Sequence, residues 1–145
     1  MKKLRVANGF LAQAASLLEE GSSVRLRIDG GSMRPFIRGG EDEVCLLPAP
    51  PVDDIPFGAC LFYCWQGQYM VHRYVGREGD VLVLMGDGNL AQKERIPAAE
   101  VLGILSRIYH KDGSITDCLS AKWLRKGRIW YRMRFFRQIL LSLCR

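Results

Sequence analysis

The stretch at residues 58–89, GACLFYCWQGQYMVHRYVGREGDVLVLMGDGN, constrains the fold more than any other part of the chain. It contains three runs of apolar, aromatic and β-branched residues, at 60–63, 69–75 and 81–85, which are separated by the turn sequences QGQ and REGD. Short apolar runs joined by glycine-containing turns are typical of antiparallel strands. The sequence therefore predicts a β-hairpin followed by a further strand.

More strand signals lie on both sides of this stretch. Val24, Leu26 and Ile28 alternate with Arg25 and Arg27, which is the pattern of a half-buried strand. The runs VCLL at 44–47 and VLGILSRIY at 101–109 predict two more strands. Because 145 residues can bury one core and not two, we expect a single, mainly β domain.

A helix is predicted at each end of this β region. Near the N-terminus, the residues that face one side of an amphipathic helix are Leu4, Leu11, Ala14, Leu17 and Leu18. Near the C-terminus, apolar residues recur at helical spacing among Arg128, Arg132 and Arg137, and they are Ile129, Met133, Phe136, Leu140 and Leu143. We therefore divide the chain into a domain at 1–121 and a basic amphipathic helix at 122–145.

The charge of the chain is concentrated in this C-terminal segment. The net charge is +6, yet residues 1–121 hold 13 Lys/Arg against 15 Asp/Glu, while residues 122–145 hold 8 Lys/Arg and no acid. A basic helix with aromatic residues is suited to an anionic membrane surface, so one expectation is peripheral membrane contact through 122–145. The alternative is that this helix packs on the domain or docks a partner, with its arginines solvated.

Neither a signal peptide nor a membrane span is expected. The N-terminal apolar stretch is broken by polar residues and ends in Glu19-Glu20, and no run approaches the roughly 20 apolar residues of a membrane span. We therefore expect a cytoplasmic location. The five cysteines include no CxxC pair and there are only two histidines, so no metal-ligand cluster is expected.

The segment GGSMRPFI at 30–37 places Ser32 after two glycines and shortly before Pro35. Two glycines permit a tight turn, and Pro35 fixes its own φ and restricts the residue before it. One interpretation is an ordinary turn between strands, for which Gly-Gly-Ser is common. The other is a serine presented as a nucleophile, which requires a base elsewhere in the chain.

Histidine suits this base best, because the ordinary pKa of its side chain lies near neutral pH, and the sequence has two, His72 and His110; a lysine can also serve where burial lowers its pKa. His72 lies within the predicted strand YMVHRYV, which would hold its ring rigidly, whereas His110 lies at a strand end beside a turn. His72 is therefore the better candidate. Its alternative role is that of a core or surface histidine whose hydrogen bonds are satisfied.

Three segments in order, GGSMRPFI at 30–37, YMVHRYV at 69–75 and LVLMGDGN at 82–89, resemble the three boxes of the signal peptidase family, within the S24/S26 serine peptidases. The family pattern is G-S-M-x-P, then a box with the general base, then G-D-x-N. Bacterial-type leader peptidases and LexA-like repressor proteases carry lysine as the base, and the archaeal and endoplasmic-reticulum type carries His-Arg. The pair His72-Arg73 makes this chain similar to the serine–histidine type, over roughly residues 24–108.

The resemblance implies a signal peptidase/LexA-like β-barrel-type domain and a serine endopeptidase. It implies that Ser32 is the nucleophile, with its backbone N–H in the oxyanion hole, and that His72 is the general base. It further implies that Met33 and Pro35 shape the substrate cleft and that Asp87 orients the imidazolium. Asp87 has an alternative role in turn chemistry, because Asp-Gly-Asn is a good turn sequence in any protein.

The chain departs from the family pattern in three places. Gly30 stands where many relatives have a serine that donates to the oxyanion. A second acidic residue after the third box is not clearly placed, so the third catalytic group stays open between Asp87 and Glu94. An apolar anchor helix like that of those relatives is not expected from this sequence, which has no apolar run of that length.

The expected function is therefore removal of a leader or signal-like segment from a peptide or protein precursor, without a metal or organic cofactor. The alternative is a catalytically inert β module of the same fold that binds a peptide by strand addition. Nucleic acid is not an expected partner, because repressor-type relatives carry a DNA-binding domain that the short N-terminal helix cannot provide.

Overall fold

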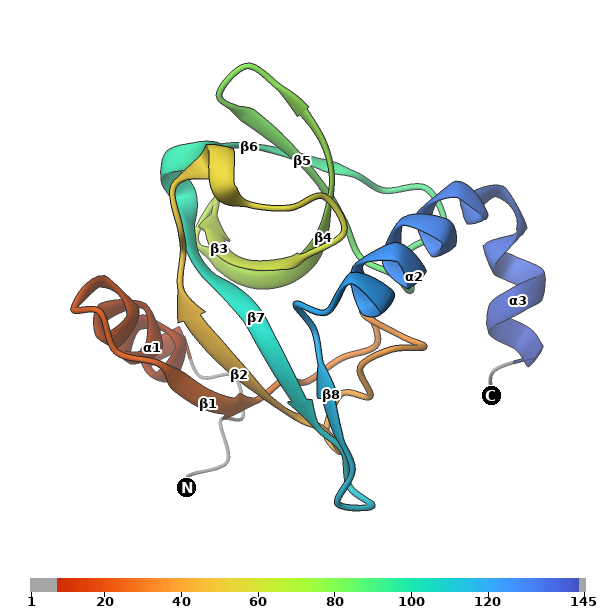
Figure 1. Ribbon diagram of the computed structural model, residues 1–145, viewed down its shortest axis with the longest axis horizontal. Coiled ribbons are helices and arrows are strands. Elements are labelled where there is room, and N and C mark those ends of the chain that lie inside the picture. Colours follow the sequence, from red (N-terminus) through yellow and green to blue (C-terminus); the bar gives the residue numbers. More distant parts are fainter. Residues whose placement is uncertain (1–7, 144–145) are drawn as a thin grey trace.

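The computed structural model describes residues 8–143, which form one antiparallel sheet flanked by helices (Figure 1). The strand order is β1-β2-β7-β3-β4-β5-β6, and β8 pairs with β7 beside β3. The strands are β1 Val24–Arg27, β2 Glu43–Pro48, β3 Cys60–Trp65, β4 Gln68–Glu78, β5 Val81–Met85, β6 Glu94–Pro97, β7 Val101–Tyr109 and β8 Ile115–Asp117. Two short 3-10 turns, η1 Val52–Asp54 and η2 Ala98–Glu100, precede β3 and β7.

The prediction of a mainly β chain with helices at both ends is confirmed. The barrel-type closure expected from the resemblance is not formed among the described residues, since β1 and β6 lie at opposite ends of the strand order. The sheet nevertheless curls strongly, so that β5 and β6 lie above β3 and β4 in Figure 1. This curl brings β1, the β3–β4 hairpin and β6 around one hollow.

The predicted hairpin is formed by β3 and β4, joined by Gln66 and Gly67. Both turn residues have positive φ, 51° and 77°, which gives the two-residue turn whose twist matches the flanking strands. The turn fixes the register, so that Leu61 pairs with His72 and Tyr63 pairs with Met70. Tyr63 and His72 are therefore diagonal neighbours on the same face of the sheet.

Helix α1, Asn8–Glu19, covers the sheet at β1, β2 and β7. Its buried residues are Leu11, Ala14, Ala15 and Leu18. Leu17, predicted to face the same side, is 43% exposed because it lies a third of a turn away from this stripe. Leu4 lies outside the described residues.

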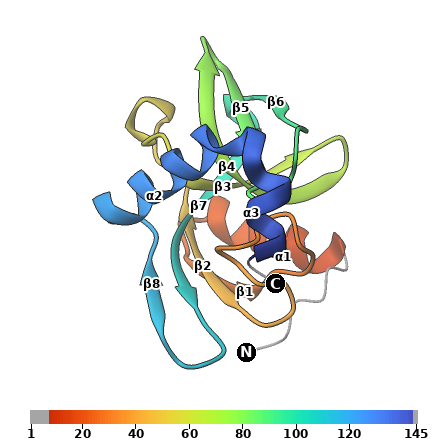
Figure 2. The ribbon, with the colours of Figure 1, turned by 90° about the vertical axis from the view of Figure 1, so that its right-hand side faces the viewer.

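The C-terminal segment contains α2, Ala121–Arg132, then η3, Arg134–Phe136, and α3, Arg137–Leu143. These helices lie on the opposite side of the sheet from α1 (Figures 1 and 2). The prediction of one continuous helix is wrong: α2 ends at Arg132, and the next residue, Met133, has a φ of −88° and a ψ of 11°, outside the helical region.

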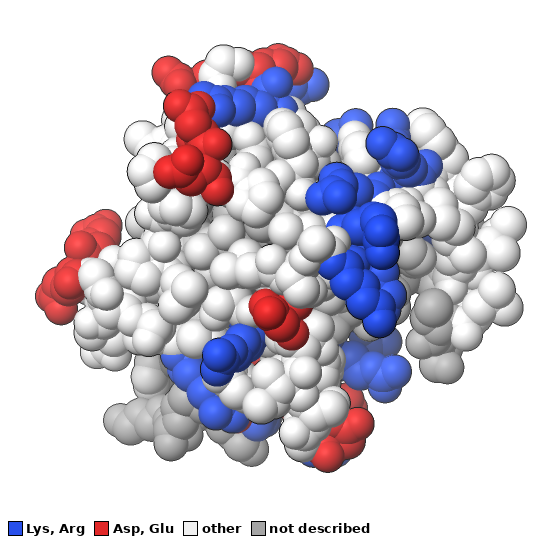
Figure 3. Space-filling view, in the orientation of Figure 1, with Lys and Arg blue, Asp and Glu red and all other residues white. Residues whose placement is uncertain are grey.

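The side of α2 that packs on the domain is not the apolar stripe identified from the sequence. The residues of α2 that are buried against the sheet are Trp123, Leu124, Gly127 and Trp130. Ile129 and Met133, from the predicted stripe, are 49% and 38% exposed. Figure 3 shows Lys and Arg side chains gathered in a band over α2. The tail thus packs on the domain with one side and presents a mixed basic and apolar surface on the other.

Candidate active site

Ser32 lies in a compact series of turns that follows β1. Hydrogen bonds from Arg34 N to Gly31 O and from Ile37 N to Met33 O, at 3.2 and 3.0 Å, fold the segment, and the Arg34–Pro35 peptide is cis. The carbonyl of Ser32 accepts from the N–H of Gly88 at 2.8 Å. The nucleophile candidate is therefore held by the backbone of the 86–89 loop.

Gly88 is required for this approach of two backbones. A Cβ at this position would overlap the carbonyl oxygen of Gly31, and the clash with main chain could not be relieved by a rotamer change. The motif residue thus has a packing role: it lets the loop after β5 lie directly against the Ser32 turn.

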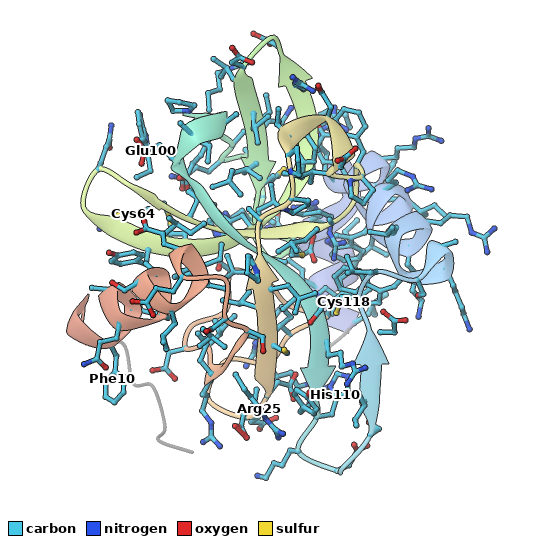
Figure 4. The ribbon with its side chains drawn as sticks, turned by 60° about the vertical axis from the view of Figure 1, so that its left-hand side comes forward. Phe10, Arg25, Cys64, Glu100, His110 and Cys118 are labelled. Atoms are coloured by element: carbon cyan, nitrogen blue, oxygen red, sulfur yellow. The ribbon has the colours of Figure 1, made fainter. Side chains whose placement is uncertain are left out.

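His72 lies in β4 with its ring 5% exposed and its Nε2 atom 3.3 Å from the Oγ of Ser32. The structure therefore brings together the two side chains chosen from the sequence as nucleophile and base. His110 lies at the far end of β7, beside β8 (Figure 4). There its Nε2 is 2.6 Å from the Thr116 hydroxyl, so it takes no part in the Ser32 site.

The Nδ1 side of the His72 ring meets a tyrosine and a carboxylate. The hydroxyl of Tyr63 is 2.8 Å from Nδ1 and donates to Glu94 Oε2 at 3.2 Å, and Glu94 Oε1 lies 3.5 Å from Nδ1. Because the single hydroxyl proton of Tyr63 is given to Glu94, the tyrosine oxygen accepts from Nδ1–H. This network assigns the tautomer in which Nε2 carries the lone pair and faces Ser32.

Burial lowers the pKa of His72 to about 4. The ring is therefore neutral at neutral pH, the state in which Nε2 can accept a proton. Burial, followed by the neighbouring Glu94, raises the pKa of the Tyr63 hydroxyl well above its usual range. Tyr63 thus keeps its proton and acts as a fixed hydrogen-bonding bridge.

Asp87 lies on the other face of β4 from the His72 ring. Its two carboxylate oxygens accept from Arg73 Nε and Nη2 at 2.8 and 2.6 Å, and the pair is fully buried. The expectation that Asp87 orients the imidazole is corrected by this geometry, because neighbouring residues in a strand point to opposite faces. Of the two carboxylates left open by the sequence, Glu94 is the one beside the ring.

Ser32 and His72 open onto a cleft of about 700 Å³. One wall of the cleft is formed by residues 26–29, at the end of β1 and just after it. The other wall is the β3–β4 hairpin, with Phe62, Trp65, Tyr69 and Met70. Met33 and Pro35, predicted to shape this cleft, lie elsewhere. Met33 is a core residue with 2% exposure, and Pro35 lines a separate cavity of about 220 Å³ with Leu141 of α3. The turn that presents Ser32 therefore directs Met33 into the core and Pro35 toward α3, away from the cleft.

The C-terminal helices hold the 86–89 loop from behind. Trp130 Nε1 donates to the carbonyl of Asp87 at 2.8 Å. Arg137 Nη1 donates to the carbonyls of Gly86 and Asn89, at 2.8 and 2.7 Å. Gly88 of this loop donates its N–H to the carbonyl of Ser32. The C-terminal helices therefore support the turn that carries Ser32 through the 86–89 loop.

Tyr63, Trp130 and Arg137 belong to this arrangement and were not found from the sequence. Tyr63 could have been found from the sequence, because a two-residue turn at Gln66-Gly67 puts it on the same face of the hairpin as His72. Trp130 and Arg137 gave no such signal, since their partners are backbone carbonyls more than forty positions earlier in the chain.

Comparison of the chain with models of known protein families finds no match, and comparison with curated proteins finds no relative. Within residues 8–143, every helix is too short or too polar to cross a membrane.

Proposed function

We propose that this chain is a serine endopeptidase of the signal peptidase-like type, which removes a leader or signal-like segment from a peptide or protein precursor. The observation that carries the proposal is the contact of 3.3 Å between Ser32 Oγ and His72 Nε2, in a ring whose other nitrogen is held by Tyr63. A serine becomes nucleophilic when a positioned base removes its proton during attack. The motif resemblance supports the same assignment.

The proposed reaction follows from the hydrogen-bond network. As Ser32 Oγ bonds to the scissile carbonyl carbon, its proton moves to His72 Nε2, and Glu94 stabilises the imidazolium across 3.5 Å. The imidazolium then gives this proton to the departing amine, which leaves an acyl ester on Ser32. A water molecule then attacks the ester carbon while His72 Nε2 takes one of its protons. As the bond between the acyl carbon and Ser32 Oγ breaks, the imidazolium returns that proton to Oγ, which releases the acid product and restores both side chains.

The oxyanion would be stabilised by the backbone N–H of Ser32. Among residues 8–143 this N–H has no acceptor, so it is available to a ligand. Gly30 offers no side-chain donor, so the backbone group is the main candidate. One such donor typically contributes about 10²–10³ in rate.

The open cleft favours an extended peptide over a small molecule. Its walls are a strand at the end of the sheet order, β1, and the aromatic side of the β3–β4 hairpin. A peptide strand could hydrogen-bond to β1 while its side chains contact Trp65 and Met70, which are half-buried and lie on the same face of the hairpin as His72. Binding along this wall leads the substrate backbone past Ser32.

The proposal is tested with a defined mixture of peptides, in which new N-termini are identified by mass spectrometry. We expect cleavage by the wild type, none by Ser32→Ala or His72→Ala, and wild-type cleavage by Ser22→Ala, an exposed serine outside the cleft. Peptide binding by isothermal calorimetry with no cleavage in any condition would instead support the inert peptide-binding module.

A further inference from the structure

The exposed side of the C-terminal helices carries six large apolar side chains, which we call the C-terminal apolar face. They are Ile129 at 49% exposure, Met133 at 38%, Phe135 at 82%, Phe136 at 62%, Ile139 at 64% and Leu143 at 77%. Isolated exposed apolar residues are ordinary, but a group of this size on one short segment marks an interaction surface.

This face is not needed to attach the helices to the domain. Trp123 and Leu124 bury the opposite side of α2, Trp130 bonds the carbonyl of Asp87, and Arg137 anchors the start of α3 with 1% exposure. The apolar side chains on the outer side therefore remain free to contact something else while the fold is intact.

Cations border the α2 end of the apolar face. Arg125, Lys126 and Arg132 are exposed and lie four before, three before and three after Ile129, so they flank it on the helix surface. Arg134 lies between two aromatic rings, with its Cζ 4.3 Å from the centroid of Tyr131 and 4.5 Å from that of Phe135. The chain has no Asp or Glu after Asp117.

We propose that the C-terminal apolar face binds the surface of an anionic lipid bilayer. Phe and Ile side chains enter the region between headgroups and acyl chains, while the flanking Arg and Lys contact lipid phosphates. In Figure 3 the basic band of α2 lies beside the uncharged surface toward α3, so a bilayer surface can contact both.

The charge pattern argues against the other occupants. A second copy of the chain would place Arg125, Lys126 and Arg132 against the same cations, with no acid on the face to pair with them. Nucleic acid would take the cations and leave Phe135 and Phe136 exposed. The apolar residues protrude, as the 82% exposure of Phe135 shows, and a deformable lipid layer accepts protruding side chains without a matching groove.

Lipid binding would place the cleft close to the membrane. Lys93, which lines the cleft, lies with its Nζ 5.3 Å from the ring centroid of Tyr131. Leu141 of α3 shares a cavity with Gly31 and Pro35, next to the Ser32 turn. The inference stands on the surface itself and does not depend on peptidase activity.

The test is sedimentation of the full chain with vesicles of phosphatidylcholine alone and with vesicles that also contain phosphatidylglycerol. We expect binding to the anionic vesicles that weakens with added salt. The triple variant Phe135→Ser/Phe136→Ser/Ile139→Ser should lose it. The variant Arg125→Gln/Lys126→Gln/Arg132→Gln should bind on the order of 100-fold more weakly, since each cation contributes about fivefold.

Ile115→Ser is the matched control, because Ile115 is 60% exposed on β8, away from this face, and its replacement should leave vesicle binding unchanged. Circular dichroism checks that every variant is folded. The proposal is overturned if the wild type ignores anionic vesicles, or if both triple variants bind as the wild type does. A dimer in light scattering that Phe135→Ser/Phe136→Ser/Ile139→Ser abolishes would also overturn it, in favour of a second copy.

Discussion

Arg73 and Asp87 form a buried bidentate ion pair directly across β4 from the candidate catalytic pair, with contacts of 2.8 and 2.6 Å. Arg73 also donates to the carbonyl of Gly58 and lies under the ring of Trp123, whose centroid is 4.4 Å from its Cζ. One guanidinium thus joins β4, the 86–89 loop and α2. The residue before it in the strand, His72, points to the other face and meets Ser32.

Replacing Asp87 should destabilise the fold strongly. In Asp87→Asn, Arg73 keeps its charge in a site with no solvent access, and we expect the free energy of unfolding to fall by about 3–5 kcal/mol in urea denaturation. Asp53→Asn is the control, because the side chain of Asp53 is 82% exposed in its pair with Arg77, and its replacement should leave the free energy of unfolding nearly unchanged. Equal, small effects in both variants would contradict the structural role of Asp87.

Gly127 tests the contact between α2 and the ion pair. On an isolated helix, Gly→Ala stabilises by about 1 kcal/mol. Here a Cβ would overlap the guanidinium of Arg73, so we expect Gly127→Ala to lower the melting temperature. Gly76→Ala is the control, since its Cβ would meet Val83 at an ordinary 3.6 Å. A rise in melting temperature for Gly127→Ala would show that α2 does not pack here.

Tyr63 is expected to position the base. Tyr63→Phe removes the oxygen that accepts from Nδ1, and we expect peptide cleavage to fall by about 10- to 100-fold in kcat with little change in KM, on the scale of one charge-assisted hydrogen bond. Glu94→Gln should act in the same direction, since it removes the charge facing the imidazolium. Tyr109→Phe, at the far end of β7, should cleave as the wild type does. A loss in KM alone would assign Tyr63 to substrate binding.

The low pKa of His72 predicts a pH dependence of stability. The folded ring protonates near pH 4, whereas an unfolded histidine protonates near 6.5, so the unfolded state binds more protons between these values. The free energy of unfolding should therefore fall as the pH drops from 7 towards 4, by up to roughly 3 kcal/mol. In urea denaturation across this range, His72→Gln should lose this part of the dependence. An unchanged slope in the variant would contradict it.

The same pKa bears on catalysis. A general base must be neutral in the free enzyme, so the acid limb of kcat/KM should lie near pH 4 and not near 6.5. The measurement is the pH profile of kcat/KM for peptide cleavage.

Local pattern was sufficient for the strands and the central hairpin. Apolar runs with glycine-containing turns depend on neighbouring residues alone, and β3, β4 and β5 formed where the pattern placed them. The tail shows the limit of such reasoning. Its helix has apolar residues on two sides, and periodicity cannot say which side the sheet will cover. The surface under α2 contains Arg73 of β4 and the carbonyl of Asp87 in the 86–89 loop. Trp123 stacks on the first and Trp130 donates to the second, and an aliphatic side chain such as Ile129 can do neither.

The sequence by itself was enough to choose Ser32 and His72 as the candidate pair, because the glycine turn, the strand histidine and the resemblance of three segments to the signal peptidase boxes all pointed to them, and their side chains lie 3.3 Å apart. Only the tertiary structure decided which side chains contact the His72 ring on its Nδ1 side. Strand alternation places Arg73, and with it Asp87, on the face of β4 opposite the His72 ring. The register of the hairpin places Tyr63 at the ring, and the curl of the sheet brings Glu94 of β6 there. Such contacts join distant strands, and their geometry depends on sheet curvature and register, which are properties of the whole packed fold and not of any local segment.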